Sequence, residues 1–291
     1  MNTLQGPLLM VAAMAGFAAE DALIKALSGY LPIGQIGILL GVGGLIVFGL
    51  WARAQGKRIF VLDALRGALL VRNLSEMLAV VFMLLGIAMA PLTVVSAVLQ
   101  AMPLTVTLGA AVFLHEPVGW RRWSAIIVGF VGVLLIIGPG GTSFDPTALL
   151  PLGAVIMLTI RDLATRRIPA HVASVQVSAW GFSVVIPSGI MLFLVTDASP
   201  VAMSSWTWMM MGLTLCAGIV GYVCLVAATR AGDIAQTTPF RYSRLVFGMI
   251  IGITVFGERP DGVMLLGAGL VVLAGFYALM REIRVSRAHI G

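Results

Sequence analysis

The sequence contains very few charged residues for its length, and this scarcity excludes a soluble globular protein. Asp, Glu, Lys and Arg make up only 10% of its 291 residues, whereas about 25% is typical of a soluble domain. Hydrophobic residues account for 60% of the chain, and its mean hydropathy is +1.06. Because a spanning helix needs about 20 mostly apolar residues, the sequence predicts several membrane spans and no sizeable soluble domain.

Cysteine and histidine are also scarce, with two Cys and three His in the chain. Cys216 and Cys224 share one apolar segment and lie about 12 Å apart along a helix, which is too far for a disulfide. The histidines fall at predicted loops or in the tail, with Glu116 as the one adjacent carboxylate: His115, His171 and His289. The Walker sequence GxxxxGK[ST] of ATP-binding loops does not occur. We therefore expect no enzymatic activity, catalytic residue, metal site, cofactor or ATPase subunit.

Apolar runs separated by Gly, Pro and charged residues predict ten helices. Strands of a membrane barrel are not expected, because the runs are longer than the about 9–11 residues of such strands and do not alternate. The predicted fold class is an all-α integral membrane protein with ten transmembrane helices. The predicted ranges are 4–27, 34–52, 67–88, 91–114, 119–138, 148–167, 172–195, 204–229, 233–256 and 261–281.

The positions of the basic residues predict the orientation of these helices. Lys and Arg outnumber Asp and Glu by 18 to 12, an excess that we assign to loops and not to a nucleic-acid partner. Most lie in the predicted even-numbered loops or the C-terminal tail: Arg53, Lys57, Arg58, Arg66, Arg121, Arg122, Arg166, Arg167, Arg230, Arg281, Arg284 and Arg287. Because cytoplasmic loops are enriched in Lys and Arg, both termini are predicted to be cytoplasmic. The first apolar stretch has no basic residue before it, so we interpret it as an uncleaved span.

The two halves of the chain resemble each other. The stretch VFLHEP at 112–117 is nearly repeated as VFGERP at 255–260. Shifts of 141 or 142 residues also pair sparse polar residues between the halves: Asp21 with Asp162, Lys25 with Arg166, Gln100 with Tyr242, and Glu116 with Glu258. This pattern predicts a duplication into residues 1–140 and 141–291. Five helices per half would insert the second half inverted relative to the first, as in secondary transporters.

Residues 89–136 resemble the EamA unit of the drug/metabolite transporter superfamily. In that unit a proline lies mid-helix, a glutamate and often a proline close the helix, and a Gly-rich span follows. These places are taken here by Pro103, Glu116, Pro117, Gly129 and Gly132. The second half matches through Glu258, Pro260 and Gly275, but Leu245 stands where the first half has Pro103. Any kink in the ninth helix is therefore left to Pro239.

The resemblance covers essentially the whole chain, and the chain is most similar to the ten-helix amino-acid and metabolite exporters. It implies an inner-membrane carrier with a central cavity, a small-molecule substrate and no ATPase, working by alternating access. Export of aromatic or other neutral amino acids is what the resemblance implies, whereas residue spacing alone indicates a small polar or amphipathic solute. The alternatives are another metabolite or cationic drug, including a vitamin or nucleotide-sugar precursor, and, in a different class, a channel or receptor-like scaffold.

Ionisable residues within predicted spans are candidates for substrate binding or ion coupling, because a charge at mid-bilayer costs about 2.5–3.5 kcal/mol. The candidates are Glu20, Asp21, Arg72, Glu76, Arg241 and Arg244. Arg72 and Glu76 lie one helical turn apart and can neutralise each other, so they are either a structural pair that extends toward the cytoplasm or part of the cavity. Arg241 and Arg244 either extend to the cytoplasmic surface or bind a substrate carboxylate.

Other side chains are predicted to line the central cavity. The uncharged candidates are Phe17, Asn73, Met77, Gln100, Trp180, Tyr222, Gln236, Phe240 and Tyr242. Gln100 and Tyr242 are equivalent in the repeat alignment, so two hydrogen-bonding side chains would lie at matching depths. The intramembrane aromatic residues either stack on a planar substrate or serve in packing. Hinge or helix-end roles are predicted for Pro103, Glu116, Pro239 and Glu258.

Overall fold

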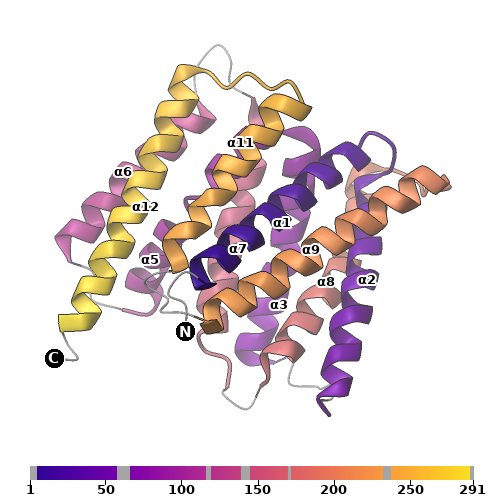
Figure 1. Cartoon of the computed structure of the whole chain (residues 1–291), viewed down its shortest axis with the longest axis horizontal. Coiled ribbons are helices and arrows are strands. Elements are labelled where there is room, and N and C mark those ends of the chain that lie inside the picture. The colour runs from indigo at the N-terminus through magenta and orange to yellow at the C-terminus, as the bar shows by residue number, and fades with distance from the viewer. Residues whose placement is uncertain are drawn as a thin grey trace.

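The protein is a bundle of helices (Figure 1). A computed structural model describes residues 5–57, 66–115, 119–138, 145–169, 172–231 and 237–288, and within these ranges the regular structure is helical throughout. Nine helical stretches of the described chain are long and apolar enough to cross a membrane. The tenth predicted span appears as a further helical stretch, whose predicted first residues lie outside the described ranges. The predicted all-α membrane fold is confirmed.

The helices follow the predicted spans closely. The first half contains α1 (Gln5–Leu27), α2 (Ile33–Ala54), α3 (Gly67–Met89), α4 (Leu92–Leu99), α5 (Met102–Phe113) and α6 (Trp120–Ile137). The second half contains η2 (Pro146–Ala148), α7 (Leu149–Thr165), α8 (Ser174–Thr196), α9 (Ser205–Ala231), η3 (Thr238–Tyr242), α11 (Ser243–Val255) and α12 (Gly262–Ala288).

Two predicted spans are not single regular helices. The predicted helix 91–114 is divided into α4 and α5, with Gln100 and Ala101 between them. Pro103 is the second residue of α5, where proline is tolerated because the first N–H groups of a helix have no intrahelical partner. The predicted helix 233–256 begins, in the described residues, with the short 3₁₀ helix η3, which contains Pro239. Both breaks therefore coincide with a proline.

Helices pack in a pattern that is symmetric between the two halves. α1 packs against α9, and α3 packs against α7. The repeat alignment relates the first predicted helix, α1, to the sixth, α7, and the third, α3, to the eighth, α9. Exchanging the halves therefore converts the α1–α9 pair into the α3–α7 pair. The pairs α2 with α8, α4 with α11, and α6 with α12 each convert into themselves. Figure 1 shows α1 beside α9 and α6 beside α12.

Glycine permits close approach in two of these pairs. A Cβ atom added at Gly34 of α2 would lie 2.6 Å from the carbonyl oxygen of Gly189 on α8. A Cβ atom added at Gly132 of α6 would lie 2.7 Å from the carbonyl oxygen of Gly267 on α12. Small residues at helix contacts are typical of membrane proteins, where association depends on close packing because the lipid is itself apolar.

Apolar and charged side chains are distributed as expected for a bundle surrounded by lipid. Large apolar side chains are exposed on the outer surface, including Leu194 at 80% and Leu273 at 68%. Charged side chains lie inside, with Asp21 at 4% and Arg72 at 7% exposure. Because charge is costly in the bilayer, interior charges are expected to pair with one another or face a water-filled cavity.

Candidate functional site

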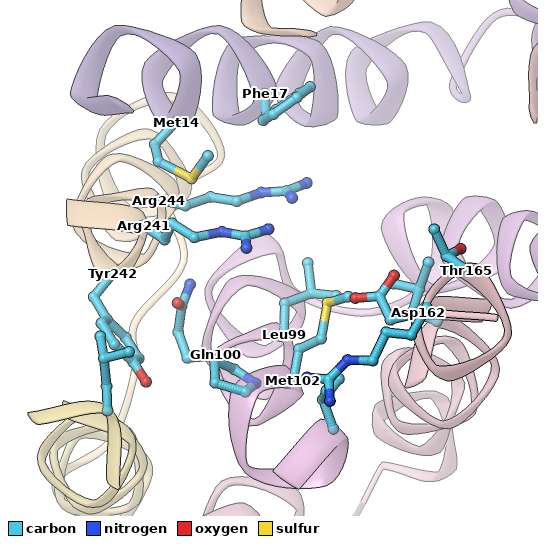
Figure 2. Close-up of a pocket in the computed structure, with 15 residues that line it drawn as sticks. Met14, Phe17, Leu99, Gln100, Met102, Asp162, Thr165, Arg241, Tyr242 and Arg244 are labelled. Atoms are coloured by element: carbon cyan, nitrogen blue, oxygen red, sulfur yellow. The ribbon is translucent and has the colours of Figure 1, made fainter. Parts of the chain in front are cut away.

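A cavity with two connected lobes lies inside the bundle. The first lobe has a volume of about 410 Å³ and the second about 670 Å³. The two lobes share seven of their lining residues: Phe17, Met102, Leu158, Asp162, Thr165, Arg241 and Arg244. These residues come from α1 and α5 of the first half and from α7, η3 and α11 of the second. The two lobes therefore adjoin each other, and residues of both halves line them; Figure 2 shows the first lobe.

The cavity extends to the end of the bundle at which α7 ends and α8 begins. Thr165, the last residue of α7, lines both lobes. Pro169 and Val172, in the connection to α8, line the second lobe. The charge pattern of the loops predicts that this end faces the cytoplasm.

Arg244 on α11 forms an ion pair with Asp21 on α1. Its Nη2 atom donates to Oδ2 of Asp21 at 2.6 Å, and its Nε atom donates to the same oxygen at 3.2 Å. The guanidinium also lies over the ring of Phe17, 5.5 Å from the ring centroid. These contacts compensate the charge of Arg244 and join the two halves at the cavity wall.

A second group of charges links α3 to α7. Glu76 lies 3.3 Å from Nη2 of Arg72 and 3.2 Å from Nη1 of Arg161. Arg161 in turn lies 2.8 Å from Oδ1 of Asp162, and Arg72 donates to Oδ1 of Asn73 at 3.0 Å. The pair between Arg72 and Glu76, expected from their spacing, is thus present within a larger group that lines the second lobe.

Arg241 differs from the other arginines of the cavity. It is an exposed residue of η3 that lines both lobes. Within the described part of the chain its guanidinium forms no hydrogen bond or ion pair, while its backbone carbonyl accepts from the N–H of Ser243. Figure 2 shows its side chain beside that of Arg244, with Asp162 on the opposite side of the cavity. Its positive charge is therefore directed into the cavity and is not matched by a contacting carboxylate.

Aromatic rings form one wall of the second lobe. Phe17, Phe182 and Tyr222 line it from α1, α8 and α9. The ring of Phe182 stacks on that of Phe48, with centroids 5.1 Å apart and planes inclined by 12°. Tyr222 meets Phe48 edge-on at 4.8 Å and shares a hydrogen bond with Ser178. These contacts hold the rings of Phe182 and Tyr222 in place.

Gln100 and Tyr242 both line the first lobe, one from each half. The Nε2 atom of Gln100 donates to the carbonyl oxygen of Ser96 at 3.2 Å. The hydroxyl of Tyr242 lies against Gly275 of α12, where an added Cβ atom would overlap it. That hydroxyl is buried and has no hydrogen-bond partner in the described part of the chain. It therefore points at α12 and not at the cavity, as Figure 2 also shows.

Four predicted cavity residues lie outside the lining of the two lobes. Asn73 is buried and accepts the hydrogen bond from Arg72. The carbonyl oxygen of Met77 accepts a hydrogen bond from Ser188. Trp180 is 4% exposed and packs in an apolar cluster, whereas Phe240 is 42% exposed. Trp180 and Asn73 therefore serve in packing and in holding Arg72, respectively.

The remaining predicted residues have varied positions. Glu20 lies against Gly218 of α9 and is not among the lining residues. Pro103 lines the first lobe at the start of α5. Gln236 and Glu116, predicted as a cavity residue and a helix-end residue, lie outside the described residues.

The cavity includes residues that the sequence reasoning did not select. Arg161 and Asp162 are charged residues inside a predicted span, and the repeat alignment pairs them with Glu20 and Asp21. That pairing is a signal in the sequence for Arg161 and Asp162, because Glu20 and Asp21 are themselves candidates. Phe182 carried no such signal, since an aromatic residue in a span is as compatible with packing as with a cavity wall.

An apolar helical bundle with a charged cavity between two similar halves defines a membrane transport protein. The chain belongs to the EamA-like transporter family, whose model matches residues 4–138 and 146–280. The family resemblance that the sequence motifs indicated is confirmed, with one match in each half.

Curated relatives of the chain are transporters. The chain is 25% identical to a riboflavin transporter of Vibrio cholerae, over 98% of this chain and 96% of the relative. It is 27% identical to a pseudopaline exporter of Pseudomonas aeruginosa, over 92% of this chain and 94% of the relative. An S-adenosylmethionine uptake transporter of Rickettsia bellii is also 27% identical, over 68% of this chain and 67% of the relative.

A solved protein crystal structure has the same fold. It superposes with a TM-score of 0.61 and 19% sequence identity, covering 96% of this chain and 98% of its own. The classification as a multi-pass membrane transporter rests on the family model and the relatives.

Proposed function

We propose that the protein is a secondary carrier that exports small amphipathic metabolites, with aromatic or other neutral amino acids as the first candidate substrates. The observation that carries this proposal is the two-lobed cavity between the halves, which combines an aromatic wall with charged side chains. Such a cavity offers an apolar surface to a ring and polar groups to the ends of the same molecule.

The size and composition of the cavity support a small organic solute. Its lobes of about 410 and 670 Å³ are in the range of about 300–1,000 Å³ that is typical of small-molecule sites. Phe17, Phe182 and Tyr222 provide flat apolar surfaces on which a planar group can stack. A purely ionic pathway needs no such aromatic wall, which favours a carrier over an ion channel.

The position of the cavity supports alternating access. Residues from both halves line it, and it extends to the connection between α7 and α8 at one end of the bundle. Movement of one half against the other would close that end and open the opposite one. We place the open end, together with both termini, in the cytoplasm of a bacterial-type inner membrane, on the basis of the positive residues in the loops.

A planar vitamin is the second candidate substrate. The riboflavin transporter of Vibrio cholerae matches 98% of this chain, and the aromatic wall suits a fused ring system as well as an aromatic amino acid. The pseudopaline exporter among the relatives supports export, and the S-adenosylmethionine uptake transporter provides uptake as the alternative direction.

A thermal-shift panel on purified protein tests the substrate class. The panel contains aromatic and aliphatic neutral amino acids, riboflavin and hydrophobic organic cations. A ligand that binds the folded protein raises its melting temperature, and we expect this for aromatic amino acids. A rise with organic cations, and none with amino acids or riboflavin, would contradict the proposed substrate class.

A further inference from the structure

We propose that Arg241 binds the acidic group of the substrate, so that the transported molecules carry a carboxylate. This inference rests on the proposed function, because it assigns a role within the same cavity. It goes further by separating carboxylates, such as amino acids, from neutral planar molecules, such as riboflavin.

The first step of the argument is the pairing of cavity arginines. Arg72 and Arg161 contact Glu76, Arg161 also contacts Asp162, and Arg244 contacts Asp21. Arg241 lines both lobes and contacts no carboxylate of the described chain. A charge inside a membrane protein is expected to have a partner or water. A carboxylate of the substrate would provide that partner.

The second step is the chemistry of the side chain. A guanidinium group presents several N–H donors in one plane and matches a carboxylate through two parallel hydrogen bonds. Lysine has no such fork, so the geometry of Arg241 adds selectivity to its charge. The position of Arg241 in η3, directly before α11, also places it beside the N-terminus of a helix, where negative charge is stabilised.

The third step is the arrangement of opposite charges across the cavity. Asp162 lines both lobes and lies opposite Arg241 in Figure 2. A substrate with its carboxylate at Arg241 can direct its ammonium group toward Asp162, which already accepts from Arg161 at 2.8 Å. The two ends of an amino acid thus meet opposite charges, and its side chain reaches the aromatic wall.

Matched ligands test this inference directly. Phenylalanine and phenylalaninamide differ in the carboxylate and keep the ring and the amino group. Binding of both is measured on the full-length purified protein, for wild type, Arg241→Gln and Arg241→Lys. We expect wild type to prefer the acid, and Arg241→Gln to lose about 10- to 100-fold in affinity for the acid alone, as for a charge-assisted hydrogen bond. Arg241→Lys should recover part of the loss.

A charge-matched control is Arg53→Gln, which removes an exposed arginine at the end of α2 and should leave both affinities unchanged. Melting temperatures of all variants show whether they fold. The inference is overturned if wild type binds acid and amide with equal affinity, or if Arg241→Gln prefers the acid as strongly as wild type does. Either result leaves a cavity that binds planar solutes. Failure of every compound to bind wild type contradicts the proposed function itself.

A separate observation, at the opposite end of the bundle, supports a second inference. Glu258 follows α11, and its carboxylate accepts hydrogen bonds from the first residues of α4. Oε1 accepts from the backbone N–H of Leu92 at 2.5 Å, and Oε2 accepts from that of Thr93 at 2.8 Å. The residue before α4 is Pro91, which provides no side-chain cap. A residue of the second half therefore caps a helix of the first.

The sequence makes room for this cap. Gly257 has a φ angle of +66°, a conformation that glycine adopts without strain, and it turns the chain after α11. The N–H of Glu258 then bonds the carbonyl oxygen of Gly252 at 3.0 Å. A Cβ atom at Gly252 would lie 2.7 Å from both Oε2 of Glu258 and Cγ2 of Thr93, so a larger residue would displace the carboxylate.

Lys25 at the end of α1 completes the contact. Its Nζ atom lies 4.0 Å from Oε1 of Glu258 and donates to the carbonyl oxygen of Ala90 at 2.6 Å and to that of Ile87 at 3.3 Å. We name this pair and its hydrogen bonds the Lys25–Glu258 latch. The latch joins the ends of α1, α3 and α4 in the first half to the segment after α11 in the second.

The latch lies far from the end at which the cavity reaches the α7–α8 connection. Gly86, near the end of α3, lies against Pro151 near the start of α7, whereas the cavity reaches Thr165 at the end of that helix. The 17 residues of α7 separate its ends by about 24 Å. Figure 1 shows the α11–α12 connection in the upper part of the view and the start of α8 in the lower part.

We infer that the latch keeps this end of the bundle closed and must break before the cavity opens there. Cysteine labelling tests this inference in proteoliposomes. In a Cys216→Ala, Cys224→Ala background, Met102→Cys places one thiol in the cavity. Labelling by a membrane-impermeant maleimide is measured from each side. Glu258→Ala and Lys25→Met should each raise labelling from the latch side, by about tenfold if the lost contacts are worth about 1.4 kcal/mol.

Asp261→Asn is the matched control, because Asp261 also caps a helix through the N–H of Met264, at 2.7 Å, but does so within its own half. It should leave labelling from the latch side unchanged. Melting temperatures identify variants that do not fold. Unchanged labelling in both folded latch variants overturns the inference, as does an equal increase in Asp261→Asn.

Discussion

Asp21 on α1 and Arg244 on α11 form an ion pair at 2.6 Å that joins the first half of the transporter to the second. Asp21 is 4% exposed, and Arg244 lines both lobes of the cavity. The pair therefore holds two charges at the wall of the cavity in a defined position. The neighbouring Arg241 also lines both lobes and contacts no carboxylate of the described residues.

Replacing Asp21 should destabilise the protein. Asp21→Asn leaves Arg244 without its carboxylate, and removing one partner of such a pair costs on the order of 2 kcal/mol when the group is partly exposed. The measurement is the free energy of unfolding in detergent for Asp21→Asn, Arg244→Gln and the double variant. We expect the double variant to be more stable than the sum of the single losses predicts. If the losses in the free energy of unfolding of the two single variants add up to the loss in the double variant, the pair does not contribute to stability.

Replacing Glu76 should impair both stability and transport. Glu76→Gln removes the negative charge between Arg72 and Arg161, so two cations at the second lobe would repel each other. We expect a lower melting temperature and slower uptake of labelled substrate into proteoliposomes. Asp145→Asn, at an exposed cap before η2, is the control and should change neither. Wild-type behaviour of Glu76→Gln would contradict the role of this charge.

Removing the ring of Phe182 should weaken the binding of planar ligands. Phe182→Ala removes the lining ring that stacks on Phe48, and loss of an aromatic contact costs about 0.5–1.5 kcal/mol beyond the lost area. We expect a loss of about tenfold in affinity for tryptophan and a smaller loss for alanine. Leu194→Ala, on the lipid-facing surface, is the control. Equal losses for both amino acids would argue against stacking.

The topology predicts that the C-terminus lies in the cytoplasm. A fluorescent protein fused after residue 291 should fluoresce in cells, whereas alkaline phosphatase at the same place should be inactive. The physical reason is the concentration of Lys and Arg in the predicted even-numbered loops and the tail. An active phosphatase fusion would reverse the proposed orientation and would place the open end of the cavity outside.

The fold was largely predictable from the sequence, because it depends on patterns that the bilayer imposes. Long apolar runs predicted the positions of the spans, although α12 continues to Ala288, beyond the predicted end at residue 281. Prolines coincide with the breaks near Gln100 and η3. The family followed from the spacing of motifs such as VFLHEP and VFGERP.

The contacts of the cavity were less predictable, because they connect residues far apart in the chain. Spacing on one helix identified Arg72 and Glu76, but it could not show that Arg161 of α7 joins them. Asp21 and Arg244 were selected separately, and only the packing of α1 on α11 shows that they pair. Glu258 was predicted as a helix-end residue; its carboxylate lies at the start of α4, a helix of the other half.

Counterflow in proteoliposomes is the measurement that tests the central claim most directly. Vesicles containing wild-type protein are loaded with unlabelled phenylalanine and diluted into labelled phenylalanine. A carrier with one cavity between two halves predicts transient accumulation of label above equilibrium, saturation with substrate, and a strong decrease in Arg241→Gln. Entry of label that does not saturate and is not stimulated by internal phenylalanine or riboflavin would contradict the account.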